Sequence, residues 1–342
     1  MLVSELRELL SKYKEKELRL LIVEMYKAMP KKIREEKEID KLLKDVNEFL
    51  SMGKAKKKQE QVDLDLLKPE IEEFIEYAYK QYYCAPNSYV HKKERPKWRF
   101  KVKAYIKSLE SVPVEGEEGK TATDLMDKLY GMLSYACGYY IFNTEDPFRS
   151  VGINQTDLVD SIIQRKFGNG FNKESIRSAI ELVINSRLDR ETLHSYLINV
   201  LVKHLKTPDT KEIAIEQCYI LRAEQLNPNL NKSKRSSSSD FYEYEKRERL
   251  NNLVETVFRL NMALGEYDKA IKYFTQNYKD RDKEVSLYVL LFLLYQYDLK
   301  EYWLSVYEDA VKKGIEPRRG LQITYEYIKE NDEMPEYFQS SR

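Results

Sequence analysis

The chain has 342 residues, and 42% of them are hydrophobic, which is enough for a substantial core and excludes a wholly disordered protein. The 58 Lys and Arg residues nearly balance 57 Asp and Glu residues, so the net charge of +1 predicts no general attraction to nucleic acid or to membranes. Only 11 Gly and 10 Pro residues occur, which disfavours the many tight turns of an all-β fold. High charge of balanced sign favours amphipathic helices with charged faces in water.

The cysteines and the apolar segments indicate the compartment. Cys84, Cys137 and Cys218 are odd in number and form no CxxC pair, which is typical of a reducing environment. The first residues, "MLVSELRELL", include acidic side chains and lack the long apolar core of a signal peptide. The longest apolar run, 287–295, is too short to span a bilayer. We therefore expect a cytoplasmic protein that has no membrane partner.

Apolar residues recur at spacings of three and four through the first 50 residues. Leu18, Leu21, Ile22 and Met25 form a stripe that predicts an amphipathic helix. Pro30 is expected to end this helix, because the residue before a proline disfavours the helical conformation. Further helices are predicted at about 39–50 and 71–82.

The segment "RPKWRFKVKAYIK" (95–107) combines basic and apolar residues and contains no acidic one. Read as a strand, its alternation fails at Tyr105 and Ile106, whereas a helical stripe continues through them. That stripe consists of Trp98, Val102, Tyr105, Ile106 and Leu109. The longer pattern favours a helix, on which Phe100 lies off the apolar stripe.

A long apolar helix is predicted at 121–142, and shorter helices at about 156–167, 173–186, 190–206 and 210–226. Asp189 and Asp209 stand where N-caps are expected. The polar, Ser-rich run "NPNLNKSKRSSSSD" (227–240) indicates a mobile linker. The predicted organisation is an N-terminal helical domain (1–150), helical hairpins (151–226), a mobile linker (227–243) and further helical hairpins (244–342).

Within the last part, "LGEYDKAIKYF" (264–274) resembles the turn and second helix of a tetratricopeptide repeat. Gly265 lets the chain reverse between two helices, and Tyr267 covers the turn. The small Ala270 permits close helix approach, and Phe274 fills the gap one turn later. About one repeat length onward, "YDLKEYWLSVYEDAVKKGIEP" has the same helix–turn–helix rhythm, which is near the 34-residue period of the family.

The resemblance covers about residues 247–317 and implies stacked helical hairpins, with a solenoid-like C-terminal part. Phe258 and Asn277 depart from the small residues usual in the family, and Pro317 closes only the second unit. The N-terminal part, through its opening helix and the "RPK…AYIK" run, is similar to an uncharacterised bacterial family of short helical proteins. That similarity implies no known activity. The predicted fold class is all-α.

The residues of the chain provide little catalytic chemistry. His91, His194 and His204 form no HExxH or other ligand pair, so no metal site is predicted. No Walker loop, GxGxxG or GxSxG motif occurs, so no cofactor and no catalytic residue are predicted.

One remote alternative comes from "RLDRETLH" (187–194), which is similar to the Arg–His pair of HEPN-type ribonucleases. The resemblance implies that His194 acts as an acid and base at a phosphodiester. The polar residue expected after Arg187 is missing, and the spacing from Arg190 is short. A surface histidine near a helix start is the competing interpretation.

The leading interpretation is a non-enzymatic scaffold, because stacked helical hairpins usually bind a peptide or helix of another protein. The alternative is a nucleic-acid-binding protein that uses the basic segment 95–107, with cations placed to contact successive phosphates. The candidate contact residues are Lys97, Arg99, Lys101, Lys103 and Lys107. A merely solvated face, partly neutralised by the acidic run at 115–119, is the competing reading.

Overall fold

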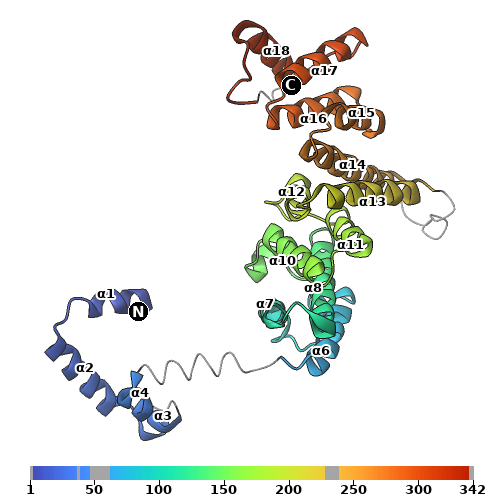
Figure 1. The fold of residues 1–342 in the computed structure, drawn as a ribbon. Helices are drawn as coiled ribbons and strands as arrows, with labels where there is room; N and C mark the ends of the chain where they lie inside the picture. The colour runs from blue at the N-terminus through green and yellow to red at the C-terminus, as the bar shows by residue number, and fades with distance from the viewer. Residues whose placement is uncertain (1–2, 37–38, 47–61, 228–238, 339–342) are drawn as a thin grey trace. The chain divides into compact units, whose positions relative to one another are not determined.

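The computed structural model describes residues 3–36, 39–46, 62–227 and 239–338 (Figure 1). Every regular element in these ranges is a helix, so the predicted all-α class is confirmed. The chain forms two compact units, unit 1 (Met1–Gln61) and unit 2 (Val62–Arg342). No helix of the described ranges combines the length and apolarity needed to cross a lipid bilayer.

The described part of unit 1 contains four short helices and has almost no interior. These helices are α1 (Val3–Leu10), α2 (Glu15–Ala28), α3 (Lys31–Glu36) and α4 (Ile39–Lys44). The Tyr26 hydroxyl donates to Asp40 Oδ1 at 2.6 Å, and the Arg34 guanidinium lies over the Tyr26 ring. Neither α2 nor α4 buries a single residue. The predicted amphipathic helix is therefore present, but its apolar stripe is not covered within the described residues.

The first half of unit 2 is built around one long helix, α8 (Gly116–Ala136). It contacts four neighbours, which are α6 (Leu64–Tyr79), α7 (Trp98–Ser111), α9 (Pro147–Val151) and α10 (Gln155–Gly168). Met126, Leu129 and Leu133 of α8 are fully buried at these contacts. A single 3₁₀ turn, η1 (Arg95–Lys97), leads into α7.

Three further helices follow in the stack, namely α11 (Lys173–Ile184), α12 (His194–His204) and α13 (Pro208–Leu226). Both expected N-caps at this point are wrong. Asp189 accepts hydrogen bonds from the amides of Glu191 and Thr192, so it closes a turn before α12 rather than starting the helix. Thr207 caps α13, and Asp209 lies inside its first turn, where a negative charge also favours the helix dipole.

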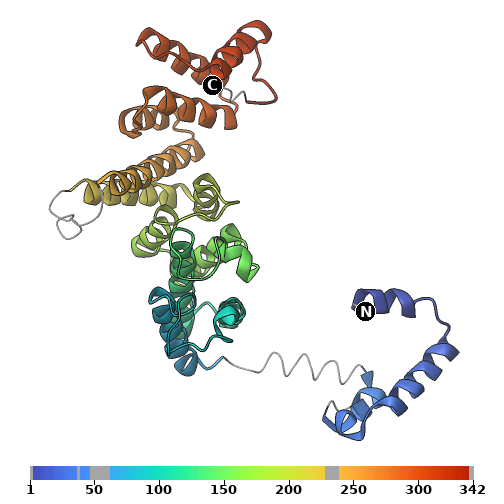
Figure 2. The same ribbon diagram turned by 180° about the vertical axis from the view of Figure 1, so that it is seen from behind.

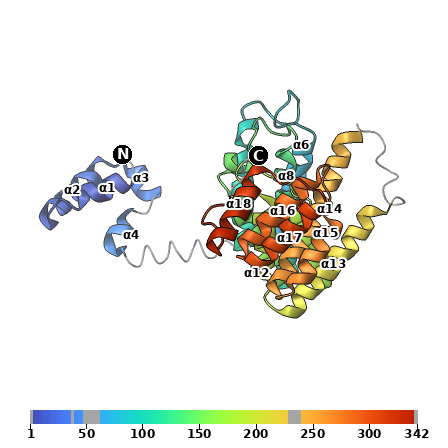
Figure 3. The same cartoon turned by 90° about the horizontal axis from the view of Figure 1, so that it is seen from above.

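The expected mobile linker at 227–243 falls mostly on 228–238, which lies outside the described residues. Its last residues belong to a helix, because α14 spans Ser239–Ala263 without interruption. α13 and α14 pack side by side as a pair of helices (Figure 3).

The C-terminal part continues with α15 (Tyr267–Asn277), α16 (Lys283–Gln296), α17 (Lys300–Lys312) and α18 (Arg319–Asn331). The turns α14–α15 and α16–α17 each contain one left-handed residue, Gly265 (φ +78°) and Asp298 (φ +54°). In both turns the amide after the left-handed residue bonds back to a carbonyl five positions earlier, at Asn261 and at Leu294. The same helix-ending geometry therefore recurs in two successive hairpins.

Buried apolar residues form two cores, and α14 belongs to both. Val257 lies in the first core, which extends from Ile71 to Leu260, whereas Phe258 lies in the second, which extends from Val254 to Ile328. The first core crosses the boundary expected at residue 150 and continues into α14. The division into two compact units falls near residue 61, inside the predicted N-terminal domain (1–150).

Candidate functional site

The predicted basic helix exists as α7, and it is anchored by its apolar stripe. The five buried residues of α7 are Trp98, Val102, Tyr105, Ile106 and Leu109, which are the five that the sequence predicted. The Trp98 ring is stacked on Phe142 with centroids 3.9 Å apart. The Tyr105 hydroxyl donates to Glu70 Oε1 at 2.7 Å, and burial, with this hydrogen bond as the smaller cause, raises the pKa of that hydroxyl. The helix cannot rotate without losing these contacts, so its outward face is defined.

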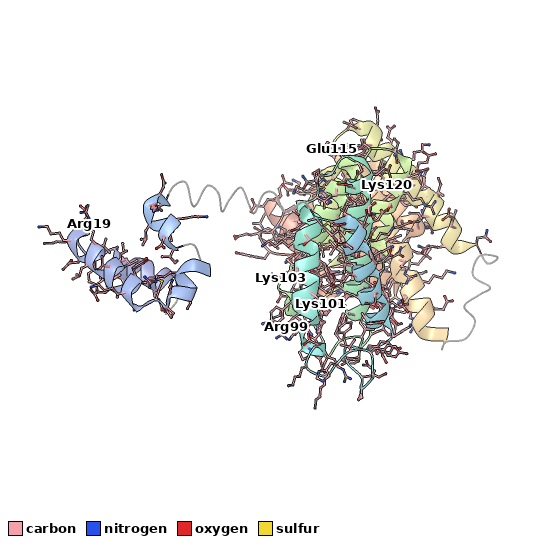
Figure 4. All side chains as sticks on the ribbon, turned by 90° about the horizontal axis from the view of Figure 1, so that it is seen from below. Arg19, Arg99, Lys101, Lys103, Glu115 and Lys120 are labelled. Carbon is pink, nitrogen blue, oxygen red and sulfur yellow. The ribbon has the colours of Figure 1, made fainter. Side chains whose placement is uncertain are left out.

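The cations of α7 do not form one continuous patch. Arg99, Lys103 and Lys107 follow one another at four-residue intervals and are exposed, as a single line along the helix. Lys101 is exposed too, but it lies about 200° around the helix from Arg99 and from Lys103, on the other flank. Figure 4 labels three of these residues along α7. We call Arg99, Lys103 and Lys107 the basic ridge.

Lys97 is not part of the basic ridge, because it already has a partner. Its Nζ lies 2.8 Å from Glu94 Oε1, and this hydrogen bond lowers the pKa of the Glu94 carboxyl. Within the described ranges, the ridge residues and Lys101 make no ion pair. The acidic run at 115–119 makes no ion pair with them in the described ranges. Glu115 stands at the N-cap position of α8 without a side-chain hydrogen bond to that helix, and it lies beyond the far end of α7 from Arg99 (Figure 4).

Two neighbours influence what the basic ridge can bind. Phe100 is 61% exposed, and the Arg99 guanidinium lies 4.8 Å from its ring centroid. Lys103 Nζ reaches the end of α9, where it lies within 3.4 Å of the position that a Cβ would take on Gly152. The last carbonyls of a helix carry partial negative charge, so Lys103 is stabilised there even without a ligand.

A second candidate site lies in the C-terminal hairpins. α15, α16 and α17 enclose an open groove of about 420 Å³, within the size range of small binding clefts. We call it the hairpin groove. Its apolar lining residues are Ile271, Phe274, Leu287, Leu290, Val306, Ala310 and Ile315. The residues singled out by the repeat-like pattern help to build it, since Ala270 and Phe274 are buried where α15 meets its neighbours.

The rim of the hairpin groove is predominantly basic. Lys279, Lys283 and Lys313 line it and make no ion pair in the part of the chain that the structure describes. Two carboxylates also line it, and one of them, Asp309, is 3.7 Å from Lys312 on its own helix. An apolar floor with an excess of positive charge at the rim matches a segment that carries both apolar and acidic side chains.

Another face of α16 is already covered by an extended segment of the chain itself. After α18 the chain turns back to α16, as Figures 1 and 2 both show. The Phe338 ring lies 5.1–5.6 Å from the rings of Tyr288, Phe292 and Tyr295. The Tyr295 hydroxyl donates to the Glu336 carbonyl at 2.6 Å. The surface of α16 thus accommodates a peptide that has aromatic and acidic residues and no regular secondary structure.

The residues of the ribonuclease-like pattern each have a different partner. Arg187 pairs with Glu245, and its guanidinium lies 4.5 Å from the Tyr139 ring centroid. Arg190 pairs with Glu145. His194 Nε2 is 3.1 Å from the Ser186 carbonyl oxygen, and burial lowers the pKa of this imidazole. The observed contacts of His194 stabilise the turn before α12 rather than pairing it with an arginine.

Cys137 and Cys218 lie in surroundings that favour the protonated thiol. Burial raises the pKa of Cys137 to about 12, and Cys218 is fully enclosed. A thiolate is the nucleophilic form, so these surroundings do not activate either residue. Among the described residues, no group of three or more His, Cys, Asp or Glu side chains is placed to hold a metal ion.

Sequence reasoning did not find the hairpin groove or the covered face of α16. Lys279 lies between α15 and α16, Lys283 begins α16, and Lys313 follows the last residue of α17. Only the packing of the three helices brings these lysines to one rim. Met334, Tyr337 and Phe338, which stand among charged residues near the C-terminus, are the signal that the sequence offers for the segment on α16. Comparison with known proteins found no matching family model, no matching curated protein and no matching solved structure.

Proposed function

We propose that this protein is a non-enzymatic scaffold of helical hairpins that binds a short segment of another protein in the hairpin groove. The single observation that carries the proposal is the open apolar floor between α15, α16 and α17. A protein rarely leaves such a concave apolar surface uncovered unless a ligand occupies it. The resemblance to tetratricopeptide repeats is compatible with this use, since helical arrays commonly bind peptides.

The chemistry of the groove defines the partner segment. Apolar side chains of the partner fill the floor beside Phe274 and Leu290, and its carboxylates lie near Lys279, Lys283 and Lys313. The segment on α16 supports this, because residues 333–338 also combine acidic, aromatic and apolar side chains. The proposed partner is therefore an acidic peptide that carries two or more large apolar residues.

The test uses the full chain as bait for a displayed library of random peptides, followed by affinity measurement on the selected ones. We expect acidic peptides with apolar anchors. Lys279→Glu/Lys283→Glu should weaken their binding roughly tenfold or more, because it reverses the charge of the rim. Lys269→Glu/Lys272→Glu is the matched control, since it changes the same charge at exposed sites of α15 outside the groove. Equal binding to both double variants would contradict the proposal.

A second candidate function is nucleic-acid binding by the basic ridge. The observation that favours it is the line of Arg99, Lys103 and Lys107, which make no ion pair among the described residues and lie beside an exposed Phe100. Three aligned cations suit the phosphates of one strand, and an exposed aromatic ring offers a stacking surface for a base.

Fluorescence anisotropy with labelled single-stranded RNA and duplex DNA over a range of salt concentrations tests this second function. Each change of Arg99, Lys103 or Lys107 to Ala should weaken binding and flatten the salt dependence by about one unit of slope. Lys97→Ala should leave the slope unchanged, because Glu94 already neutralises that cation. If Lys97→Ala has the same effect as Lys103→Ala, the ridge is not the contact surface.

A further inference from the structure

A further cleft of unit 2 lies away from both candidate sites. It is a cleft of about 640 Å³ between α8, α11, the loop after α11 and the first turns of α14, with Tyr79 of α6 at its edge. We call it the tyrosine cleft. Its walls come from distant parts of the sequence, and Figure 1 shows α8, α11 and α14 as successive parts of the same stack.

One residue of α8 that lines this cleft has no side chain. Gly131 lies in the interior of the 21-residue helix α8. Glycine is less favourable than alanine there, because its backbone loses more conformational freedom on folding. A Cβ placed on Gly131 would meet no other atom within 4 Å, so packing does not require a glycine. Its backbone is also not in the left-handed region. The effect of Gly131 is to leave empty space on the face of α8 that lines the cleft.

Aromatic rings form one wall of the tyrosine cleft. Tyr79, Tyr135 and Tyr139 line it, and their exposed fractions are 47%, 37% and 40%. The rings of Tyr135 and Tyr139 are stacked with centroids 4.3 Å apart, and Tyr79 meets Tyr135 edge-on at 5.3 Å. Partly exposed rings held in place by one another are a ready surface for stacking a flat ligand.

The adjoining wall, on which Arg187 reaches the Tyr139 ring, carries an excess of positive charge. Lys246, Arg249 and Arg187 line the cleft, and Glu245 is the carboxylate between them. The other lining carboxylates, Asp127 and Glu181, are paired from behind. Lys166 lies 2.5 Å from Asp127 and Arg177 lies 3.1 Å from Glu181, and neither cation lines the cleft. Among the described residues Lys246 makes no ion pair, so the wall can attract an anion.

The floor between the two walls is rigid. The Tyr130 hydroxyl is 2.5 Å from Ser186 Oγ and accepts a hydrogen bond from Gln155 Nε2. Ser134 Oγ accepts from the Arg187 amide at 2.7 Å, which positions the arginine at the cleft edge. These polar groups already have hydrogen-bond partners within the protein. The groups left to contact a ligand are therefore those of the aromatic wall and the basic wall.

We propose that the tyrosine cleft binds a free nucleotide. Its planar base stacks on the tyrosine wall around Tyr135, and its phosphates lie near Lys246 and Arg249. A nucleotide is the common ligand class that combines a flat ring and a phosphate anion at the two ends of one molecule, which matches the two different walls. This site is separate from the hairpin groove and from the basic ridge.

Isothermal titration of the full chain with ATP, GTP, adenosine and inorganic pyrophosphate tests the ligand class. A nucleotide should bind roughly tenfold more tightly than either adenosine or pyrophosphate, because only the nucleotide uses both walls. No heat from ATP or GTP at millimolar concentration would overturn the proposal. Pyrophosphate binding as tightly as ATP would also overturn it, since the aromatic wall would then contribute nothing.

Two pairs of matched variants test the place of binding. Gly131→Trp should weaken nucleotide binding roughly tenfold or more by filling the cleft, whereas Gly131→Ala should bind as the parent does. Lys246→Glu should weaken binding to a similar extent, and Lys120→Glu should not, because Lys120 is an exposed residue of α8 outside the cleft (Figure 4). Unchanged affinity in Lys246→Glu, a surface change that spares the fold, would place any nucleotide elsewhere and overturn the assignment.

Discussion

Helices α2 and α7 are the same length and have the same kind of sequence, yet they differ completely in burial. Each has 14 residues with apolar side chains at spacings of three and four. α7 buries five of them, and Trp98 is only 4% exposed. α2 buries none, and Ile22 and Met25 are 48% and 51% exposed. Equal amphipathic patterns have therefore led to a core element in unit 2 and to a helix whose apolar stripe no described residue of unit 1 buries.

The difference shows what an apolar stripe contributes. It makes a helix suitable for burial, but the free energy is gained only when a second element covers the stripe. α7 is covered by α8 and by Phe142. Substitutions of similar chemistry in the two units should therefore have unequal effects, and the following four predictions use that contrast.

The largest effect is expected for Trp98→Ala. Removing a buried ring that is stacked on Phe142 should lower the free energy of unfolding by about 3–5 kcal/mol. Urea denaturation followed by circular dichroism measures it. Leu20→Ala on α2 is the control, because Leu20 is 64% exposed and its loss should cost less than about 0.5 kcal/mol. Equal losses would show that α2 is covered in solution.

Ala270→Leu should have the next largest effect. Ala270 is fully buried where α15 packs in the C-terminal hairpins, so three additional carbons must displace neighbours at a cost of about 1–3 kcal/mol. Ala28→Leu, at the exposed end of α2, should leave stability nearly unchanged. The midpoint of thermal unfolding distinguishes the two. An unaltered midpoint for Ala270→Leu would mean that the hairpins are loosely packed.

The third prediction concerns pH. Burial lowers the pKa of His194 in the folded protein. As the pH falls, the imidazole is therefore protonated in the unfolded chain before it is protonated in the folded protein. The stability linked to this group is complete above the ordinary histidine pKa of about 6.5 and is lost as the pH falls below it. Unit 1 has no histidine and cannot share this dependence.

The measurement compares the parent with His194→Gln. The difference between their unfolding free energies should change between about pH 8 and about pH 5.5, with the parent losing more stability on acidification. Comparing the two proteins cancels the titration of carboxylates common to both. A difference independent of pH would show that His194 is protonated equally in the folded and unfolded states.

The smallest effect is expected for Lys103→Ala on the outward face of α7. An exposed lysine without an ion pair in the described ranges should change the free energy of unfolding by less than about 0.5 kcal/mol. Urea denaturation of Lys103→Ala and of Trp98→Ala, measured side by side, compares the free energy that the exposed face and the buried face of α7 contribute. A loss above 1 kcal/mol would assign a structural role to the contact between Lys103 and the end of α9.

Local periodicity was sufficient to predict the buried positions of α7 and several features of the C-terminal hairpins. The five buried positions of α7 follow from the helical spacing alone, because core and solvent faces repeat every 3.6 residues or so. Gly265 adopts the left-handed conformation expected at a chain reversal, and Trp303 and Tyr307 are buried on one face of α17. These features depend on neighbours along the chain, which the sequence displays directly.

The start of α12 and the position of Lys101 could not be predicted from residue type alone. Asp189 was a reasonable N-cap by residue type, yet its carboxylate bonds to the amides of a preceding turn and α12 begins at His194. Lys101 was grouped with the basic ridge by proximity in sequence, although the helical rotation places it on the other flank. In both cases the residue type predicted the kind of group correctly, a hydrogen-bond acceptor at Asp189 and an exposed cation at Lys101. The path of the backbone determined where in the structure that group lies.

The sequence alone determined the all-α class, because scarce glycine and proline and persistent helical spacing exclude most sheets. Only the tertiary structure decided which apolar stripes are covered, that α14 serves two cores, and which cations converge. Tyr79, Gly131 and Lys246 are distant in the chain and line one cleft only because α6, α8 and α14 belong to the same stack. The spacing of apolar side chains can be read from a short stretch of sequence. Whether a stripe is buried, or whether distant residues line one cleft, depends on where a second element packs, which that stretch does not specify.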